Sequence, residues 1–185
     1  MSIKYKALDW AVGTTNLPGI REAVYAIAKR DIVEWPTLPA TFVTTMGEMV
    51  KYVGDFTLAA NAKFQRIGII VDKSPVDGKS QGVRPSKTFL NQVVLQHPGV
   101  EEDASAFAMQ ANNDDLVYLV QTKKAKWRVI GNEMYQTETA IDQKLGGAAT
   151  DEMGTTLTVT CTDVAPGLFY TGEIVTEDGT INPSV

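Results

Sequence analysis

The chain has very few of the residues on which most catalytic and metal sites depend. Its 185 residues include one cysteine and one histidine. A single cysteine cannot form an internal disulfide, and it favours a reducing compartment. One cysteine and one histidine also cannot supply the ligands of a structural zinc site. We therefore expect a fold that depends on its hydrophobic core, without a metal ion or other cofactor.

Long apolar runs and excess positive charge are lacking as well. No apolar stretch approaches the roughly 18 residues of a membrane span, and the start, MSIKYKALDW, has no apolar signal-peptide core. The net charge of −5 provides no field that attracts nucleic acid. These absences argue against a membrane protein, a secreted protein and a sequence-reading nucleic-acid binder. Hydrophobic residues still make up 44% of the chain, enough for one domain over residues 1–185.

The N-terminal half of the chain contains two segments that look like arms. Residues 1–19 hold Gly13, Pro18 and Gly19 and are expected to form an N-terminal arm. Residues 20–34 fit either a helical stripe or strands, and the runs Val24–Ile27 and Ile32-Val33 lead us to favour strands. Residues 73–86, KSPVDGKSQGVRPS, are polar and predict a long loop or a two-stranded arm that turns at Asp77-Gly78.

Residues 88–132 carry the most regular pattern, which predicts strand, short helix, strand, turn, strand. The helix is expected at about 100–112, where Ala104, Phe107, Ala108 and Ala111 fall on one narrow face. Acidic residues fill its first turn, where the helix dipole favours them. Asparagines 112 and 113 can end the helix, because asparagine tolerates the left-handed conformation.

The rest of the chain reads as mainly β. A hairpin is expected at 115–132, with Lys123, Lys124 and Ala125 near its turn. The polar residues 136–154 predict a loop. In TTLTVTCT, residues 155–162, apolar residues alternate with threonines, which indicates a strand with one face exposed to solvent. A last strand and turn are expected at 168–180.

The few candidate catalytic and metal-binding residues favour structural roles. His97 could act as a general base, but no serine or cysteine lies in a nucleophile motif, so we interpret it as a strand-end residue. Cys161 lies on the apolar side of its strand and is interpreted as a buried thiol. Residues 112–115 and 177–179 offer carboxylates, but their spacing lacks the alternation of a calcium loop. A pair of carboxylates brought together by the fold, as in a glycosidase, stays open.

A basic cluster lies at the expected hairpin turn, at Lys123, Lys124, Lys126 and Arg128. It is interpreted mainly as a solvated tip, with contact to an acidic neighbouring subunit as the alternative. No phosphate-binding glycine motif is present.

Taken together, these features resemble a bacteriophage tail tube protein. The resemblance rests on a single acidic β-rich domain, the polar arm at 73–86 and the one helix within a strand–helix–strand–strand unit. The segments AKRDIVEWP, GDFTLAANAKFQRIGIIVDKSP and ANNDDLVYLVQTKKAKWRVIGNEM are similar to tail tube proteins of phages that infect Bacteroidetes. The resemblance covers most of residues 20–175.

The resemblance implies a β-sandwich or partly closed β-barrel flanked by one helix, and a structural protein rather than an enzyme. Six copies would form a ring, and rings would stack into the tube that delivers DNA to the host. The subunit would lie in the host cytoplasm before assembly and in the virion tail afterwards. Its partners would be other copies of itself, other tail proteins (tape measure, baseplate and, in a contractile tail, sheath) and DNA passing through the lumen.

The same resemblance suggests which residues make the contacts between copies. In the arm these are Asp77, Gly78, Lys79 and Arg84. In the helix and hairpin they are Phe107, Ala108, Ala111, Lys123, Lys124 and Lys126. Neither group implies a catalytic residue, a metal ligand or a cofactor.

Two other classes of function stay open at the level of sequence. One is a different tail or neck component of the same fold, such as a terminator, a stopper or a baseplate-hub homologue of the tube. The other is a β-sandwich domain that binds or hydrolyses carbohydrate. A carboxylate-lined cleft in a monomer would favour the second.

Overall fold

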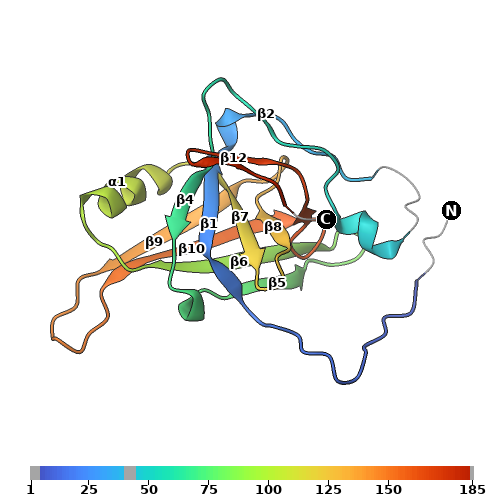
Figure 1. Ribbon diagram of the computed structural model, residues 1–185, viewed down its shortest axis with the longest axis horizontal. Coiled ribbons are helices and arrows are strands. Elements are labelled where there is room, and N and C mark those ends of the chain that lie inside the picture. Colours follow the sequence, from blue (N-terminus) through green and yellow to red (C-terminus); the bar gives the residue numbers. More distant parts are fainter. Residues whose placement is uncertain (1–4, 40–44, 184–185) are drawn as a thin grey trace.

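The structure, a computed structural model, describes residues 5–39 and 45–183. It is mainly β, with one α-helix, as the sequence predicts (Figure 1). None of the sheets closes into a barrel within the described chain, and the arrangement is that of a β-sandwich. Residues 5–19 lie outside the sheets, and their side chains are exposed almost throughout.

The first sheet has five antiparallel strands. Their order is β11 (Phe169–Tyr170), β8 (Trp127–Ile130), β7 (Leu116–Thr122), β1 (Ile20–Ala28) and β4 (Gln65–Gly68). The ambiguous segment 20–34 therefore forms strands, β1 and the short β2 (Ile32–Glu34), joined by the 3-10 turn η1 (Lys29–Asp31). The predicted hairpin is confirmed as β7 and β8, which turn through Lys123, Lys124 and Ala125.

The second sheet has four antiparallel strands. Their order is β5 (Val76–Gln81), β6 (Thr88–His97), β10 (Gly154–Asp163) and β9 (Thr137–Lys144). In Figure 1 these strands cross those of the first sheet steeply. The helix α1 (Glu102–Ala111) connects the two sheets between β6 and β7.

Small elements cover the far face of the five-stranded sheet. They are the strand pairs β2 with β3 (Thr57–Leu58) and β12 (Ile174–Thr176) with β13 (Gly179–Ile181), and the 3-10 turn η2 (Met46–Val50). A third 3-10 turn, η3 (Val71–Lys73), precedes β5.

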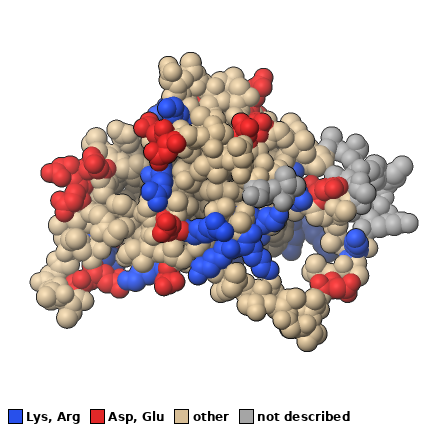
Figure 2. Space-filling model, viewed as in Figure 1, with Lys and Arg blue, Asp and Glu red and all other residues tan. Residues whose placement is uncertain are grey.

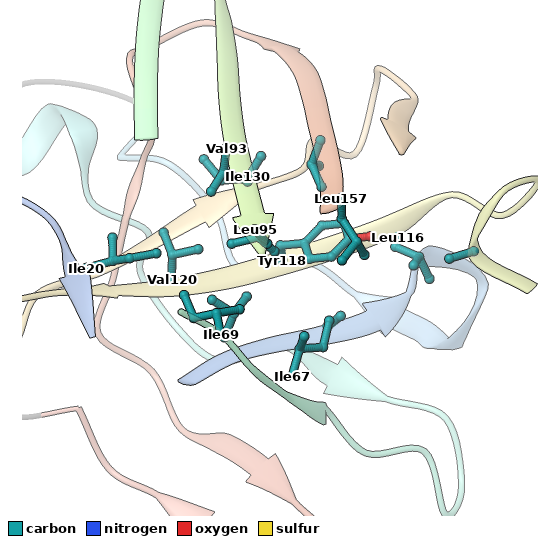
Figure 3. Packing of buried hydrophobic residues seen from close by; sticks show 14 of the residues in the cluster. Ile20, Ile67, Ile69, Val93, Leu95, Leu116, Tyr118, Val120, Ile130 and Leu157 are labelled. Atoms are coloured by element: carbon teal, nitrogen blue, oxygen red, sulfur yellow. The ribbon is translucent and has the colours of Figure 1, made fainter. Parts of the chain in front are cut away.

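Two hydrophobic cores lie on opposite faces of the five-stranded sheet. The core between the sheets contains Val93, Leu95, Tyr118 and Leu157, which meet from β6, β7 and β10 (Figure 3). The second core is aromatic and centres on Phe56, whose ring lies 5.0–5.8 Å from three other aromatic rings. Because β7 faces both cores, residues 116–120 are all buried.

Two sequence predictions about β structure are wrong. Residues 137–144 form β9 instead of a loop, with alternate side chains turned inward. The alternation is hard to see in TETAIDQK because Ile141 is the only large apolar residue on the inward side. Residues 73–86 are not a projecting arm, because β5 pairs with β6 along its whole length.

The turn predicted at Asp77-Gly78 is also misplaced. Both residues lie within β5, and the chain turns at residues 82–87. A Cβ added at Gly78 would lie 3.0 Å from Pro166 Cβ and 3.1 Å from Asn91 Oδ1. Gly78 is therefore explained by the close approach of the 165–167 loop, and not by a turn.

The helix prediction is confirmed, with one difference at its end. The helix α1 stops at Ala111, and Asn112 caps it with an ordinary helical φ of −63°. The asparagine marks the helix end as expected, but it does not adopt the left-handed conformation.

Ala125 generates a prediction about stability. Its φ of +62° lies in the left-handed region, where a Cβ is unfavourable and glycine is not penalised. We expect Ala125→Gly to stabilise the fold by about 1 kcal/mol and to raise Tm by about 2–4 °C. Thermal melting followed by circular dichroism measures this. Ala106→Gly, at an exposed position of α1, is the control and should lower Tm; a decrease for both variants would contradict the explanation.

Candidate functional site

The outward face of the four-stranded sheet is polar and almost free of charge along its centre. Alternate residues of β6 and β10 point away from the core, because their neighbours fill it. On the two central strands these outward residues are Thr88, Leu90, Gln92, Val94, Gln96, Thr156, Thr158, Thr160 and Thr162. Hydroxyl and amide groups dominate, and neither strand presents a lysine or arginine to solvent on this face.

Side-chain hydrogen bonds link three strands at one end of this polar face. The amide of Gln81, on β5, donates to Thr88 Oγ1 at 3.3 Å and to Thr162 Oγ1 at 3.1 Å. The three residues lie on three adjacent strands, so these bonds hold β5, β6 and β10 together at this end.

Both edges of this sheet lack a partner strand among the described residues. The sheet ends at β5 on one side and at β9 on the other. The charged residues of the outward face lie on these edge strands, as Asp77 and Lys79 on β5 and Glu138, Asp142 and Lys144 on β9. A free edge exposes backbone donors and acceptors, and it can pair with another strand.

The sequence-predicted arm residues therefore occupy an edge strand. Asp77, Gly78 and Lys79 follow one another on β5, and Arg84 lies in the turn between β5 and β6. Asp77, Gly78 and Lys79 therefore lie on an exposed strand edge, whereas the sequence predicts a long loop or a two-stranded arm for these residues. The sequence does not reveal the opposite edge, β9, because the polar residues of its segment predict a loop.

The predicted contact face of the helix packs on its own subunit. Phe107 packs against the core between the sheets, and Ala111 belongs to that core. Ala108 is half-buried. Ser105 Oγ also donates to Val100 O at 3.1 Å and lies 3.4 Å from Gln143 Oε1 of β9. The small residues therefore let the helix lie close to its own sheet.

The basic hairpin residues lie at the rim of an open groove. Lys123, Lys124 and Lys126 line it together with Arg128, and its volume is about 960 Å³. Figure 2 shows the basic side chains gathered over this end of β7 and β8, away from the acidic group over α1. Lys124 is bonded to Asn16 of the N-terminal arm.

Arg128 has a structural role at the base of the same groove. Its guanidinium lies 4.3 Å from the centre of the Phe169 ring and donates to the carbonyls of Pro166 and Gly167. Partial burial lowers the pKa of Arg128. The side chain thus holds the 166–169 segment and is only partly available to a ligand.

The two reactive residues named in the sequence analysis, His97 and Cys161, lie far apart, and each has a polar contact within the subunit. His97 ends β6, and its Nδ1 lies 2.8 Å from Gly68 O. Cys161 is buried, its thiol donates to Thr162 O, and burial raises its pKa to about 11. His97 pairs with Thr155, six residues along β10 from Cys161, which places the two about 20 Å apart. They do not form a nucleophile and base pair.

The carboxylates of the outward face also lie too far apart for glycoside hydrolysis. Asp77 and Glu138 occupy opposite edges of one row, three strand spacings or about 14 Å apart. Glycosidases hold their two carboxyl groups within about 9.5 Å. Among the described residues, no group of three or more histidine, cysteine, aspartate or glutamate side chains could hold a metal ion. Nor does any described helix have the length and apolar character of a membrane span.

One buried carboxyl group stands out beneath the sheet. Asp163, at the end of β10, is 1% exposed, and burial raises its pKa. Its Oδ1 accepts hydrogen bonds from Asn132 Nδ2 at 2.8 Å and Val164 N at 2.6 Å. It thereby connects β10 to the segment that follows β8, and its role is structural.

Comparison with known proteins yields no relative of this chain. No family model, no curated protein and no solved structure matches it. The functional interpretation therefore depends on the geometry described above.

The placement of the helix face predicts how it responds to charge. Ala111→Glu would bury a carboxylate in the core between the sheets and should cost about 1–3 kcal/mol of folding free energy. Ala106→Glu, on the exposed side of the same helix, should leave stability nearly unchanged. Melting at low protein concentration measures both. Equal Tm values for Ala111→Glu and the unmodified chain would show that this face is not part of the subunit core.

Asp163 predicts a pH dependence. Because its pKa is raised on folding, the folded state binds the proton more tightly, and stability falls as pH rises through the window between the unfolded and folded pKa. Asp163→Asn is neutral at every pH and keeps an oxygen to accept both hydrogen bonds. We expect the Tm of the variant minus that of the unmodified chain to increase with pH through this window. Melting curves between about pH 3 and 8 measure it, and a difference that does not change with pH would contradict the assignment.

Proposed function

We propose that this chain is the structural subunit of a bacteriophage tail tube, in which rings of six copies stack into a conduit for DNA. In this role the protein lies in the virion tail and acts by assembly instead of catalysis. The observation that carries the proposal is the four-stranded sheet, with its two free edges and its neutral polar outward face.

The direction of the edge strands suits a ring. In an antiparallel sheet of four strands, the first and last strands run in opposite directions, so β5 and β9 are antiparallel. A copy rotated about an axis beside the sheet places its β9 antiparallel to β5 of the first copy. The same pairing can repeat until the ring closes and no edge is left.

The size of such a ring suits the passage of DNA. Six sheets of four strands make twenty-four strands, and a spacing of about 4.8 Å gives a backbone cylinder at least about 37 Å across. Barrels of 16–18 strands already leave an aqueous channel. Side chains from a sheet of this kind would leave the centre of the tube open.

The chemistry of the outward face suits a polyanion that passes without binding. Proteins hold nucleic acid mainly through lysine and arginine contacts to phosphates. The central strands β6 and β10 offer only uncharged side chains on this face, and on the edge strands three carboxylates outnumber two lysines. Tail tubes commonly have an acidic lumen; here the proposed lining is neutral at its centre, which equally leaves phosphates without a partner.

Blocking one sheet edge tests the proposal. The backbone N–H of Ser80 points away from β6, so Ser80→Pro removes a donor from the free edge and leaves the pairing with β6 intact. We expect unmodified protein to form rings of six and tubes in negative-stain micrographs as concentration rises. The Ser80→Pro variant should stay monomeric with an unchanged circular dichroism spectrum.

The matched control is Ser80→Ala, which keeps the N–H group and should assemble like the unmodified chain. A monomer that persists at high concentration in the unmodified chain would reject the tube function. Normal tubes from Ser80→Pro would show that assembly does not use this edge.

A further inference from the structure

The hydrogen-bond pattern of the four-stranded sheet defines which backbone groups lie on the free edge of β5. Val94 N–H donates to Pro75 O at 3.0 Å, so these two residues form a hydrogen-bonded pair between β6 and the start of β5. Residues of an antiparallel strand turn alternately to their two neighbours. The N–H and C=O groups of Gly78 and Ser80 therefore point away from β6, toward solvent.

The same reasoning defines the free edge of β9. Thr137 N–H donates to Asp115 Oδ1 at 2.9 Å, on the side away from β10. By alternation, the backbone groups of Thr139, Ile141 and Gln143 also face away from β10. Asp115 thus covers the beginning of this edge, while its later part is left for a partner strand.

We infer that neighbouring copies pair β5 with β9 in one particular register, in which Lys79 lies opposite Asp142 of the next copy and Asp77 lies opposite Lys144. The inference rests on the proposed function, because it takes the contact to be the lateral contact of a closed ring. The partner is a second copy of this chain, and the surface comprises residues 77–81 and 140–144.

The alternation of backbone groups restricts the choice to registers that differ by two residues. Those of Gly78 and Ser80 must meet those of Thr139, Ile141 or Gln143 for hydrogen bonds to form. A shift of a single residue would oppose groups that are already bonded within each sheet, and it would turn the paired side chains to opposite faces.

Charge selects among the allowed registers. In the inferred register both facing pairs have opposite charges, Lys79 with Asp142 and Asp77 with Lys144. A shift of two residues in one direction places Asp77 opposite Asp142. The same shift in the other direction places Lys79 opposite Lys144. Like charges directly opposite each other destabilise strand pairing, so both shifted registers are disfavoured.

Barrel geometry excludes the one other register with an opposite-charge pair, Lys79 with Glu138. Within one copy, Asp77 and Glu138 lie in the same row across the sheet. If Asp77 pairs with Lys144 of the next copy, the row that ended at Glu138 continues from a residue six positions further along β9. The row is therefore displaced by six residues for every four strands. With a rise of about 3.3 Å and a spacing of about 4.8 Å, this gives a strand tilt of about 45°.

A tilt of this size agrees with closed barrels, whose strands are typically inclined by about 35–45°. The Lys79–Glu138 register displaces the row by only two residues and gives a tilt of about 20°. Closure alone allows displacements of four and six residues, with tilts of about 35° and 45°. Charge excludes the first of these, because it places Asp77 opposite Asp142, so the two constraints together leave one register.

Disulfide trapping in the full-length chain tests this register. Lys79 and Asp142 would form a non-hydrogen-bonded pair with Cα atoms about 4.5 Å apart, which a disulfide can bridge. Three double variants combine Lys79→Cys with Asp142→Cys, Ala140→Cys or Glu138→Cys. The two cysteines of each variant lie on opposite edges of one sheet, so a disulfide between them must join two copies. The buried Cys161 is common to all three.

We expect the Lys79→Cys, Asp142→Cys variant to lose its monomer band on non-reducing gels after mild oxidation and to form a ladder that ends at six chains. The variants with Ala140→Cys and Glu138→Cys should stay mainly monomeric on the same gels. A stronger ladder from either of them, or no ladder from any, would overturn the register. Variants that carry only one of the two introduced cysteines measure how much disulfide forms between copies without the designed partner.

Micrographs of the same samples separate this inference from the proposed function. A ladder from the 79–142 pair in samples without tubes would support the register and reject the tube. Tubes in which only the 79–138 or 79–140 pair is linked would support the tube and overturn the register.

Discussion

The double burial of strand β7 is the constraint on which the rest of the structure depends. Its side chains alternate between two cores, and Tyr118 also reaches across to Thr139 Oγ1 of β9 at 3.0 Å. Burial raises the pKa of Tyr118 to about 12, so its hydroxyl stays protonated and can hydrogen-bond at any ordinary pH. The five-stranded sheet is thereby covered on both faces, whereas the outward face of the four-stranded sheet is open to solvent.

Free strand edges are usually a hazard, because they can pair with any other exposed strand. Here the edges carry charges of both signs, and on each an acidic residue is followed two residues later by a lysine: Asp77 and Lys79 on β5, Asp142 and Lys144 on β9. Registers that place like charges directly opposite each other are disfavoured, whichever edges meet. In the proposed tube, these charges restrict the register in which two copies can pair. In the proposed tube, the contact between β5 of one copy and β9 of the next is heterologous, a type that can close into rings.

Much of the fold could be predicted from local patterns. The helix at 102–111, the hairpin of β7 and β8 and the strand at 154–163 each carry a clear periodicity or turn signal, and all three are confirmed. The strand β9 was missed because its inward residues, apart from Ile141, are polar and reveal no apolar alternation. Asp77-Gly78 was mistaken for a turn because glycine serves equally for a turn and for a close approach, and only the position of Pro166 distinguishes the two.

The sequence by itself determined that this is a β-rich domain with one helix, and that its one cysteine and one histidine cannot supply the ligands of a structural zinc site. Those properties depend on composition and on periodicities within single segments, which are local. Only the tertiary structure decided that residues 76–81 and 137–144 are the two edges of one sheet, and that Phe107 and Ala111 face the subunit's own core. Strand order and edge position depend on contacts between segments far apart in the chain, and no local pattern records which strand will be left without a neighbour.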